Sequence, residues 1–512
     1  MKKVIYLIAL AVVVSACSVG YENSYISGDN NYYDNAASES EPMAPPVGDD
    51  MAPQGGGTDG FEAFSENPFV KTADEPSSSF SVDADGAAYA YMRRCLMEAQ
   101  LPDRNSVRLE EYLNYFTFDY PEPEGEETLS INAEMGTCPW NAGHQLLRLG
   151  LKGKSLSEAE IPAANYIFLI DVSGSMLGAD RMTLVKNGLS TMVDYLRPED
   201  RVAIITYSGH VEKLVESTLI SEGRDAIRKA IRTLNASGST AGGEAMKMAY
   251  EEASAHYVEG GNNRIIMCTD GDFNVGVSST EALVEMVESY QEKGIYLSIM
   301  GFGRGNYQDS RMENLSNHGN GTYTYIDSEE EMIKVFVNER SHFYSVANDT
   351  KCQVRFNPEV VESYRLLGYE NRVMSAEEFE DSKKDAGEIG AGQTVTALYE
   401  LVIPDVANVA PQDGESPVLA TFEARYKKSL KDTESRSLEE DVYLDNSESE
   451  NFFFAAGVAA YGLVLRDSEY KGDANLPLAK ELVQSSLNYD PDGYRAALLG
   501  LIDRAAALKS IE

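Results

Sequence analysis

Between about residues 164 and 345, short apolar runs alternate with stretches of helical periodicity, and this alternation constrains the fold of the 512-residue chain most strongly. Residues 166–170 form a continuous apolar run, typical of a strand buried on both faces, and residues 202–207 predict a second buried strand. Between them, apolar residues recur at helical spacing from Met182 to Leu196. Strands that alternate with helices predict a doubly wound, mostly parallel sheet. Such α/β sheets bind ligands beyond the carboxyl ends of their strands.

The same pattern predicts the remaining elements of this central segment. We expect further strands at residues 211–219, 265–269, 295–302 and 322–326. We expect helices at residues 227–234, 243–257, 281–292 and 329–343.

The segments on either side contain their own strands and helices. Before the central segment, we expect helices at residues 82–99 and 107–116 and strands at 129–134 and 146–151. After it, we expect strands at 352–356, 362–367, 394–402 and 418–426, then helices at 452–466, 476–487 and 492–508. Two strands cannot cover their own apolar face, so the N-terminal pair should join the four later strands. The flanks would then form an antiparallel sheet or sandwich with accessory helices, into which the central domain is inserted.

Oxygen-bearing side chains follow the predicted strands at the edge where a ligand would bind. Asp171, Ser173 and Ser175 alternate directly after the first strand, so their oxygens can converge on one point. Thr240 lies in a loop between two predicted helices, and Asp270 follows a third buried strand. Hard divalent cations prefer oxygen ligands, so we expect Mg²⁺ here, with Ca²⁺ or Mn²⁺ as alternatives. Five protein groups leave a coordination position that an exposed Asp or Glu of a protein partner would fill.

These five residues resemble the metal-ion-dependent adhesion site of von Willebrand factor type A domains, and no member of that pattern is missing. The resemblance implies that Ser173 and Ser175 bind the metal directly. It implies that Thr240 and Asp270 exchange direct and water-mediated roles. Asp171 would act through water and through hydrogen bonds to the serines.

The flanks resemble a narrower family, the bacterial YfbK-type lipoproteins. The resemblance rests on NPFV at residues 67–70, FSVDAD at 80–85, VRLEEYLNYF at 107–116, CPWN at 138–141, YRLLGYENR at 364–372, DAGEIGAG at 385–392 and TALYEL at 396–401. Together with the central domain it covers nearly everything from about residue 66 to residue 510.

The chain is therefore expected to contain six segments. They are a lipoprotein signal peptide at 1–17, a disordered tether at 18–65, an N-terminal flanking region at 66–160, the von Willebrand factor type A domain at 161–346, a C-terminal β region at 347–445 and a helical region at 446–512.

The first seventeen residues predict the compartment. Two lysines precede an apolar run at residues 4–14, which is shorter than the roughly 20 residues of a bilayer-spanning helix. The run ends in VSAC at residues 14–17, which resembles a bacterial lipobox, so we expect a lipid anchor at Cys17 and a place in the cell envelope. Ser18 after this cysteine favours the outer over the inner membrane, by resemblance to enterobacterial sorting. The side of the membrane that the chain faces is not predicted.

The charge of the chain excludes one class of partner. Lys+Arg 43 against Asp+Glu 83 gives a formal net charge of −40, whereas nucleic-acid binding needs a basic surface. The acidic balance is compatible with cation binding. The absence of CxxC and HExxH motifs argues against a dedicated zinc site.

The cysteines do not predict a disulfide framework. Cys95, Cys138, Cys268 and Cys352 allow three full pairings, and the sequence does not choose among them. Cys268 lies in an apolar run, which is typical of a small buried hydrophobic residue.

Three functions remain open for this cation site. The first is metal-dependent binding of a protein partner. The second is a cell-envelope scaffold in which the metal only stabilises the domain. The third is a hydrolase with Ser173 or Ser175 as nucleophile. No GxSxG motif is present and the five histidines are scattered, so we do not expect an enzyme. The oligomeric state is not predicted.

Overall fold

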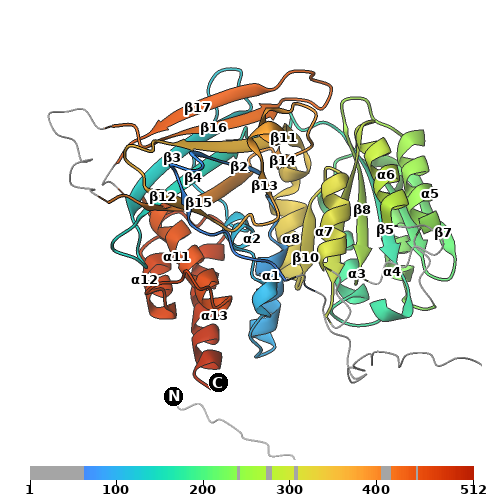
Figure 1. The fold of residues 1–512 in the computed structure, drawn as a ribbon. Coiled ribbons are helices and arrows are strands. Elements are labelled where there is room, and N and C mark those ends of the chain that lie inside the picture. The colour runs from blue at the N-terminus through green and yellow to red at the C-terminus, as the bar shows by residue number, and fades with distance from the viewer. Residues whose placement is uncertain are drawn as a thin grey trace, which may run out of the picture. The chain divides into compact units, whose positions relative to one another are not determined.

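The computed structural model describes residues 61, 63–238, 243–271, 280–304, 309–404, 417–444 and 448–511. In the central domain, six strands form one sheet in the order β10-β9-β8-β5-β6-β7 (Figure 1). Their bounds are β5 Ala164–Asp171, β6 Arg201–Tyr207, β7 Val211–Leu219, β8 Asn262–Thr269, β9 Ile295–Phe302 and β10 Tyr323–Ile326. Neighbouring strands are parallel except β6 and β7, which are antiparallel. The predicted mostly parallel sheet is confirmed.

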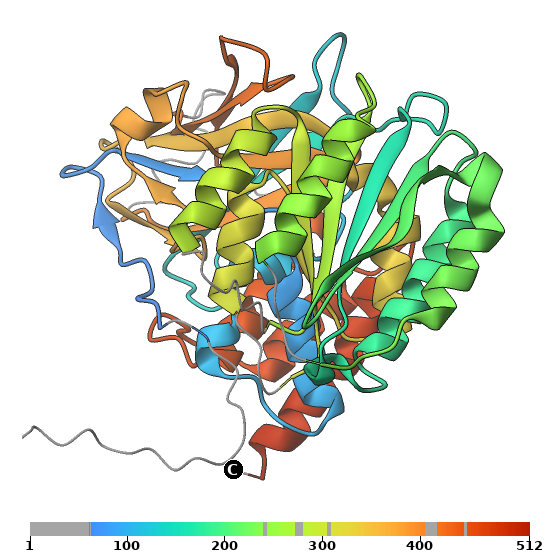
Figure 2. The same cartoon turned by 90° about the vertical axis from the view of Figure 1, so that its right-hand side faces the viewer.

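Side chains that alternate along β5 divide the helices between the two faces of this sheet, and Figure 2 shows helices on both sides of the strands. Tyr166, Phe168 and Ile170 are buried in a core with α3 (Met182–Tyr195), α4 (Ile220–Thr233) and α8 (Glu329–Ile333). Ile167 and Leu169 are buried on the other face with α5 (Gly243–Ala255), α6 (Thr280–Gln291) and α7 (Asp309–His318). This double cover explains why the strands read as continuous apolar runs.

The N-terminal flank also contributes a helix to the cover of the central sheet. Ala87, Ala90 and Tyr91 of α1 (Ala87–Met97) are buried in the same core as α5, α6 and α7. Arg93 on α1 forms ion pairs with Asp327 (2.5 Å) and Glu331 (2.6 Å) of the central domain. The flank therefore fixes one edge of the domain that carries the predicted site.

The flanking regions form two antiparallel sheets that pack as a sandwich (Figure 1). The first has the order β1-β12-β15-β4-β3, with bounds β1 Val70–Lys71, β3 Leu129–Thr137, β4 Gln145–Gly153, β12 Ser363–Leu367 and β15 Thr394–Val402. The second has the order β13-β2-β11-β16-β17, and β14 pairs with β11. The bounds of its strands are β2 Ser77–Ser81, β11 Ser345–Phe356, β13 Val373–Met374, β14 Gly387–Gly390, β16 Ala420–Lys427 and β17 Arg436–Val442. Leu147 and Leu149 of the first sheet share one core with Val354 and Phe422 of the second.

Strands from the two sides of the central domain pair with each other, as predicted. β4 pairs with β15 over eight positions, from Gln145 opposite Leu401 to Lys152 opposite Thr394. In the second sheet, β2 pairs with β11 in the same antiparallel sense. The central domain is therefore inserted between β4 and β11, and neither flank completes its sheet alone.

The C-terminal helices form a third layer against the first sheet of the sandwich. α11 (Glu450–Leu465), α12 (Leu476–Gln484) and α13 (Tyr494–Lys509) share a core with α2 (Leu109–Asn114) and with one face of α1. Trp140 is buried in this core, and its indole N–H donates to Glu400 Oε2 at 3.3 Å. The indole thus has the packing role that we expect for a buried tryptophan with a polar partner.

Several sequence-based boundaries are wrong. The helix expected at 329–343 is α8 followed by a π-helical turn, Lys334–Asn338, and a 3₁₀ turn, Arg340–Phe343. The helix expected at 82–99 begins only at Ala87, because Asp83 Oδ1 accepts the Asp85 backbone N–H (3.0 Å) and holds a turn before it. The sequence analysis did not predict the strands β1, β2, β13, β14 and β17, the helix α7 or the short helix α9 (Ala376–Glu380).

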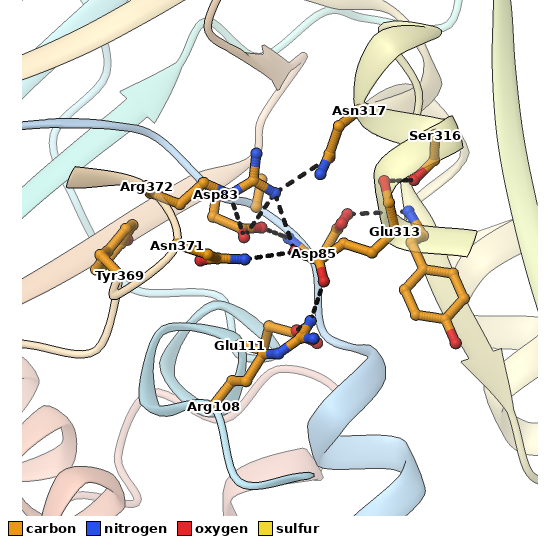
Figure 3. A network of polar contacts seen from close by, with 12 residues as sticks. Asp83, Asp85, Arg108, Glu111, Glu313, Ser316, Asn317, Tyr369, Asn371 and Arg372 are labelled. Atoms are coloured by element: carbon orange, nitrogen blue, oxygen red, sulfur yellow. Dashed lines mark hydrogen bonds and ion pairs between the residues drawn. The ribbon is translucent and has the colours of Figure 1, made fainter. Parts of the chain in front are cut away.

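Buried charges connect α7 to the flanks (Figure 3). Glu313 on α7 forms ion pairs with Arg108 and, at 3.6 Å, with Arg372. Arg372 also pairs with Asp83 (2.9 Å), and Arg108 with Glu111 (2.9 Å). Each arginine therefore bridges a carboxylate of the central domain and a carboxylate of the N-terminal flank. Removing one partner of such a buried network leaves charge without compensation, which is strongly destabilising.

Glu110 lies beside this network as a buried carboxylic acid, only 1% exposed. It lines a cavity of about 290 Å³ together with Arg108, Glu313 and Glu370. Burial, and then the charge of Glu370, raise the pKa of Glu110 to about 8. The folded protein therefore keeps this carboxyl protonated at neutral pH, whereas an exposed glutamate would be ionised.

The four cysteines in the described part of the chain are buried thiols and form no disulfide. Cys268 is 0% exposed within β8, as predicted for a small buried hydrophobic residue. Burial raises the pKa of its thiol to about 12, so it is not a reactive thiolate.

Candidate metal centre

The carboxyl ends of β5 and β8 bring two of the predicted acids to the same edge of the sheet. The two strands are parallel neighbours, with Ile170 opposite Cys268. Asp171 is the last residue of β5, and Asp270 directly follows β8. Asp171 is 0% exposed and Asp270 is 2% exposed, so both residues are buried.

A chain of short contacts links the turn after β5 to Asp270. Asp171 Oδ1 accepts the backbone N–H of Ser173 at 2.7 Å, which fixes the start of the turn. The hydroxyl oxygens of Ser173 and Ser175 lie 2.8 Å apart, and the Ser175 hydroxyl donates to Asp270 Oδ1 at 3.3 Å. Four of the five predicted ligands therefore lie together in space, although Asp270 is almost a hundred residues away from the others in the sequence.

The fifth predicted ligand, Thr240, lies outside the described residues, as does Cys17. The described chain approaches the site up to Gly238. The carbonyl of Gly238 accepts the Gly174 N–H at 3.0 Å, and the Ser237 N–H donates to the Val172 carbonyl at 2.6 Å. Ser237 and Gly238, which end this described segment, are thus hydrogen-bonded to the turn that carries the two serines.

The buried acids of the site shift the pKa of a neighbouring tyrosine. Tyr207, at the end of β6, is 0% exposed. Burial, and then the negative charge of Asp171, raise the pKa of Tyr207 well above its usual value. Two buried carboxylates at one strand edge form a region of negative potential that favours a cation.

The sequence analysis did not predict that an arginine, Arg181, contacts one of these buried carboxylates. Arg181 directly precedes α3, and its Nε lies 3.6 Å from Asp270 Oδ2. Its Nη2 donates to the main-chain carbonyl of Arg304 at 2.6 Å. The only local signal for the contact between Arg181 and Asp270 was a basic residue six positions after Ser175, at the start of an apolar helical stripe.

The rim of the site is also tied to α1 of the N-terminal flank. Arg94 pairs with Asp180 (3.1 Å), and Glu98 pairs with Arg304 (2.7 Å). Asp180 follows the serine turn, and Arg304 follows β9, so α1 connects loops on both sides of the site. No periodicity or motif in the sequence could have shown these contacts, because they join segments more than 80 residues apart.

The donor set fits a hard divalent cation. The groups that meet at the strand edge are carboxylate and hydroxyl oxygens, without thiol or imidazole. Mg²⁺ binds oxygen ligands and commonly retains water, so a few carboxylates and hydroxyls are a suitable set. The residues that would hold the ion are Asp171, Ser173, Ser175 and Asp270, with Thr240 beyond the described residues.

The same contacts do not support serine nucleophile chemistry. Among the described residues, the recorded hydrogen bonds of the Ser173 and Ser175 hydroxyls go to each other and to Asp270. A nucleophilic serine needs a neighbouring base that is itself oriented by a third group. The arrangement is therefore suited to binding rather than to acyl transfer.

A second group of acids lies in the sandwich, away from the predicted ligands. Candidate ligand atoms of Asp349, Asp385 and Glu388 all lie within 4.8 Å of one another. Burial, and then the neighbouring charge of Asp349, raise the pKa of Asp385 to about 7. Lys427 already neutralises Asp349 at 2.6 Å. Asp385 and Glu388 therefore belong to a partly buried acidic cluster with Asp349.

Comparison with known families agrees with this architecture. Residues 165–339 match the family described as von Willebrand factor type A domain, and residues 341–508 match the one described as "Uncharacterized protein YfbK, C-terminal". Residues 56–148 match a family described as von Willebrand factor.

Individual relatives cover different shares of the chain. The YfbK protein of Escherichia coli (strain K12) is 36% identical over 475 residues, which are 89% of this chain and 82% of the relative. Inter-alpha-trypsin inhibitor heavy chain H3 of Pongo abelii is 31% identical over 178 residues, 33% of this chain and 20% of the relative. Among solved structures, a von Willebrand factor type A protein from Catenulispora acidiphila has a TM-score of 0.41 at 14% identity, covering 70% of this chain and 87% of that one.

Proposed function

Since the chain belongs to the YfbK family and contains a von Willebrand factor type A domain, we propose that it binds a protein partner through a divalent cation. The cation is Mg²⁺ or an ion of similar chemistry, with Ca²⁺ and Mn²⁺ as alternatives. Asp171, Ser173, Ser175, Thr240 and Asp270 hold it, and an Asp or Glu of the partner completes its ligand shell.

One observation carries this proposal. Ser173, Ser175 and Asp270 form a continuous chain of oxygen contacts, at 2.8 and 3.3 Å, across the ends of two neighbouring strands. Ligands bind at this edge in open α/β sheets. Buried carboxylates are costly unless they are paired or bind a cation. Arg181 pairs with Asp270 at 3.6 Å, and a bound cation would compensate the charge of Asp171 as well.

The proposal is one of interaction and not of catalysis. The matched domain is an interaction domain, and this agrees with the expectation that the chain is not an enzyme. The net charge of −40 makes long-range attraction of an acidic partner weak, so short-range coordination must supply the affinity.

We propose further that acyl chains on Cys17 anchor the protein in the cell envelope, with the outer membrane favoured. The support is the apolar run and the VSAC motif at the start of the sequence. None of the helices in the described part of the chain combines the length and apolar character that crossing a bilayer requires. Several acyl chains together give stable attachment, which a single chain does not.

Crosslinking in intact cells, followed by identification of the captured proteins, tests the binding proposal. The wild-type chain is compared with Ser173→Ala, which removes one metal ligand without changing the charge, and with Ser208→Ala, a serine hydroxyl outside the proposed ligand set. We expect a partner that the wild type and Ser208→Ala capture in Mg²⁺, and that is lost with EDTA or in Ser173→Ala.

Capture that is equal in Mg²⁺ and in EDTA would show that binding does not depend on the metal. If Mg²⁺ raises the thermal unfolding midpoint while no metal-dependent partner is captured, the metal stabilises a scaffold instead. Either result contradicts the proposed function, and the second supports the scaffold alternative.

A further inference from the structure

The proposed cation site already contains a positive charge that belongs to the chain. The Arg181 guanidinium lies with its Nε 3.6 Å from Asp270 Oδ2. The Asp270 side chain is 2% exposed, whereas the Arg181 side chain is 19% exposed. The Asp270 carboxylate is therefore buried, whereas part of the Arg181 side chain reaches solvent.

The backbone is shaped to hold the guanidinium in this place. Gly303, after β9, has φ +73, and a Cβ added there would lie 2.1 Å from Arg181 Nε. The Gly303 carbonyl accepts the Tyr325 hydroxyl at 2.8 Å, and the Arg304 carbonyl accepts Arg181 Nη2 at 2.6 Å. Only glycine combines this conformation with this close approach. The position of Arg181 is thus set by the fold and not by chance contact of a long side chain.

Arg181 and a divalent cation compete for the same acid. Arginine stays charged at all physiological pH values, so the guanidinium cannot avoid the competition by losing its proton. A metal that takes Asp270 as a ligand also repels the guanidinium, because both are positive and lie close to the same carboxylate. Arg181 therefore lowers the affinity of the site for metal.

The guanidinium that leaves Asp270 is suited to a second acid. Its planar fork of N–H donors matches a carboxylate, and such charge-assisted hydrogen bonds are stronger than neutral ones. In the proposed function, a partner carboxylate arrives at the same rim. Arg181 would lose one carboxylate and gain another in the same step.

We propose that Arg181 exchanges carboxylates when the site fills. In the free protein it neutralises Asp270, and in the complex it holds the carboxylate of the partner. This inference rests on the proposed function. It predicts that, because of Arg181, the metal and the acidic partner bind cooperatively. Linkage then requires that each ligand tighten the binding of the other by the same factor.

Calorimetric titration of Mg²⁺ tests the exchange. The soluble chain of residues 18–512, which lacks only the signal peptide and Cys17, is titrated with and without saturating acetate as the simplest carboxylate. Without acetate, Arg181→Gln should bind Mg²⁺ about tenfold more tightly than the wild type, which corresponds to about 1.4 kcal/mol. Acetate should tighten Mg²⁺ binding to the wild type about tenfold and to Arg181→Gln less than about twofold.

Two further variants separate position from net charge. Arg304→Gln removes one positive charge from the same rim, but its guanidinium pairs with Glu98, so Mg²⁺ affinity should change less than about twofold. Gly303→Ala keeps every charge but pushes Arg181 away from Asp270, so it should tighten Mg²⁺ binding as Arg181→Gln does. Gly303→Ala also provides the test if Arg181→Gln does not fold.

The outcomes distinguish the inference from the function on which it rests. If Arg181→Gln binds Mg²⁺ no more tightly than the wild type, or gains as much from acetate, the exchange is refuted. The proposed function then stands, provided that Asp270→Asn abolishes Mg²⁺ binding. If the wild type itself binds no Mg²⁺, both the function and the exchange are refuted.

Discussion

Replacing Glu110 with glutamine should make the protein more stable, and increasingly so as the pH rises. Glu110 is 1% exposed, and its pKa is raised to about 8 by burial and by Glu370. In the unfolded chain its pKa returns to the ordinary value of 4.5. Because the folded state binds this proton more tightly, stability is greatest below pH 4.5 and is lost as the pH rises toward 8. Glutamine has a similar shape and no proton to lose.

The expected magnitude follows from the two pKa values. Each pH unit between them costs about 1.4 kcal/mol, so the wild type should lose about 2.5 kcal/mol relative to Glu110→Gln between pH 5 and pH 7. Urea unfolding followed by circular dichroism at pH 5, 6 and 7 measures this difference. Glu124→Gln, which removes the same charge at an exposed position, should leave the pH profile parallel to that of the wild type. A Glu110→Gln profile that is also parallel to the wild type would refute the reasoning.

The remaining predictions concern the ion pairs, the packing and the metal. Arg93→Met should lower the free energy of unfolding by about 3 kcal/mol, because Asp327 and Glu331 lose a buried counter-charge, and an unchanged urea midpoint would contradict this. Trp140→Phe should lower the free energy of unfolding by about 1–3 kcal/mol in the same assay, because it removes volume from a buried core and the hydrogen-bond donor to Glu400. A loss below about 0.5 kcal/mol, which is typical of surface substitutions, would contradict this prediction. Mg²⁺ at 100 times its dissociation constant should raise the free energy of unfolding by about 2.7 kcal/mol, and no such rise should occur in Asp270→Asn.

The central sheet could be predicted because its physical cause is local. Strands covered on both faces are apolar at nearly every position, and residues 166–170 and 202–207 have that pattern in the sequence. The acids and hydroxyls that follow these strands could be assigned to one edge because parallel strands end on the same side. Asp171 and Asp270 therefore lie together, as the topology required.

The elements that were missed have weak or contrary local signals. α7 reads DSRMENLSNH, and in its described part only Met312 and Leu315 contribute buried apolar side chains. β2 reads SSSFS and β17 reads RSLEEDV, so their strand conformation comes from pairing with β11 and β16 and not from their own side chains. Tertiary context determined these elements.

The contacts around the site show the same limit. Arg181 stands close to the serine turn in the sequence, yet its contact with Asp270 depends on the conformation of Gly303. The link from Glu98 to Arg304 depends on how α1 packs against the central sheet. Residue types and spacing predict which groups can bind a cation, whereas the charges that tune the binding are placed by distant segments.

Crystals of the soluble chain soaked with Mn²⁺ and measured at the manganese absorption edge test the central claim most directly. Anomalous scattering locates the ion without assuming which residues bind it. We expect one strong peak within about 2.5 Å of the Ser173 and Ser175 hydroxyl oxygens, beside Asp270. A peak only between Asp349, Asp385 and Glu388, or none at the carboxyl ends of β5 and β8, would contradict the cation site proposed here.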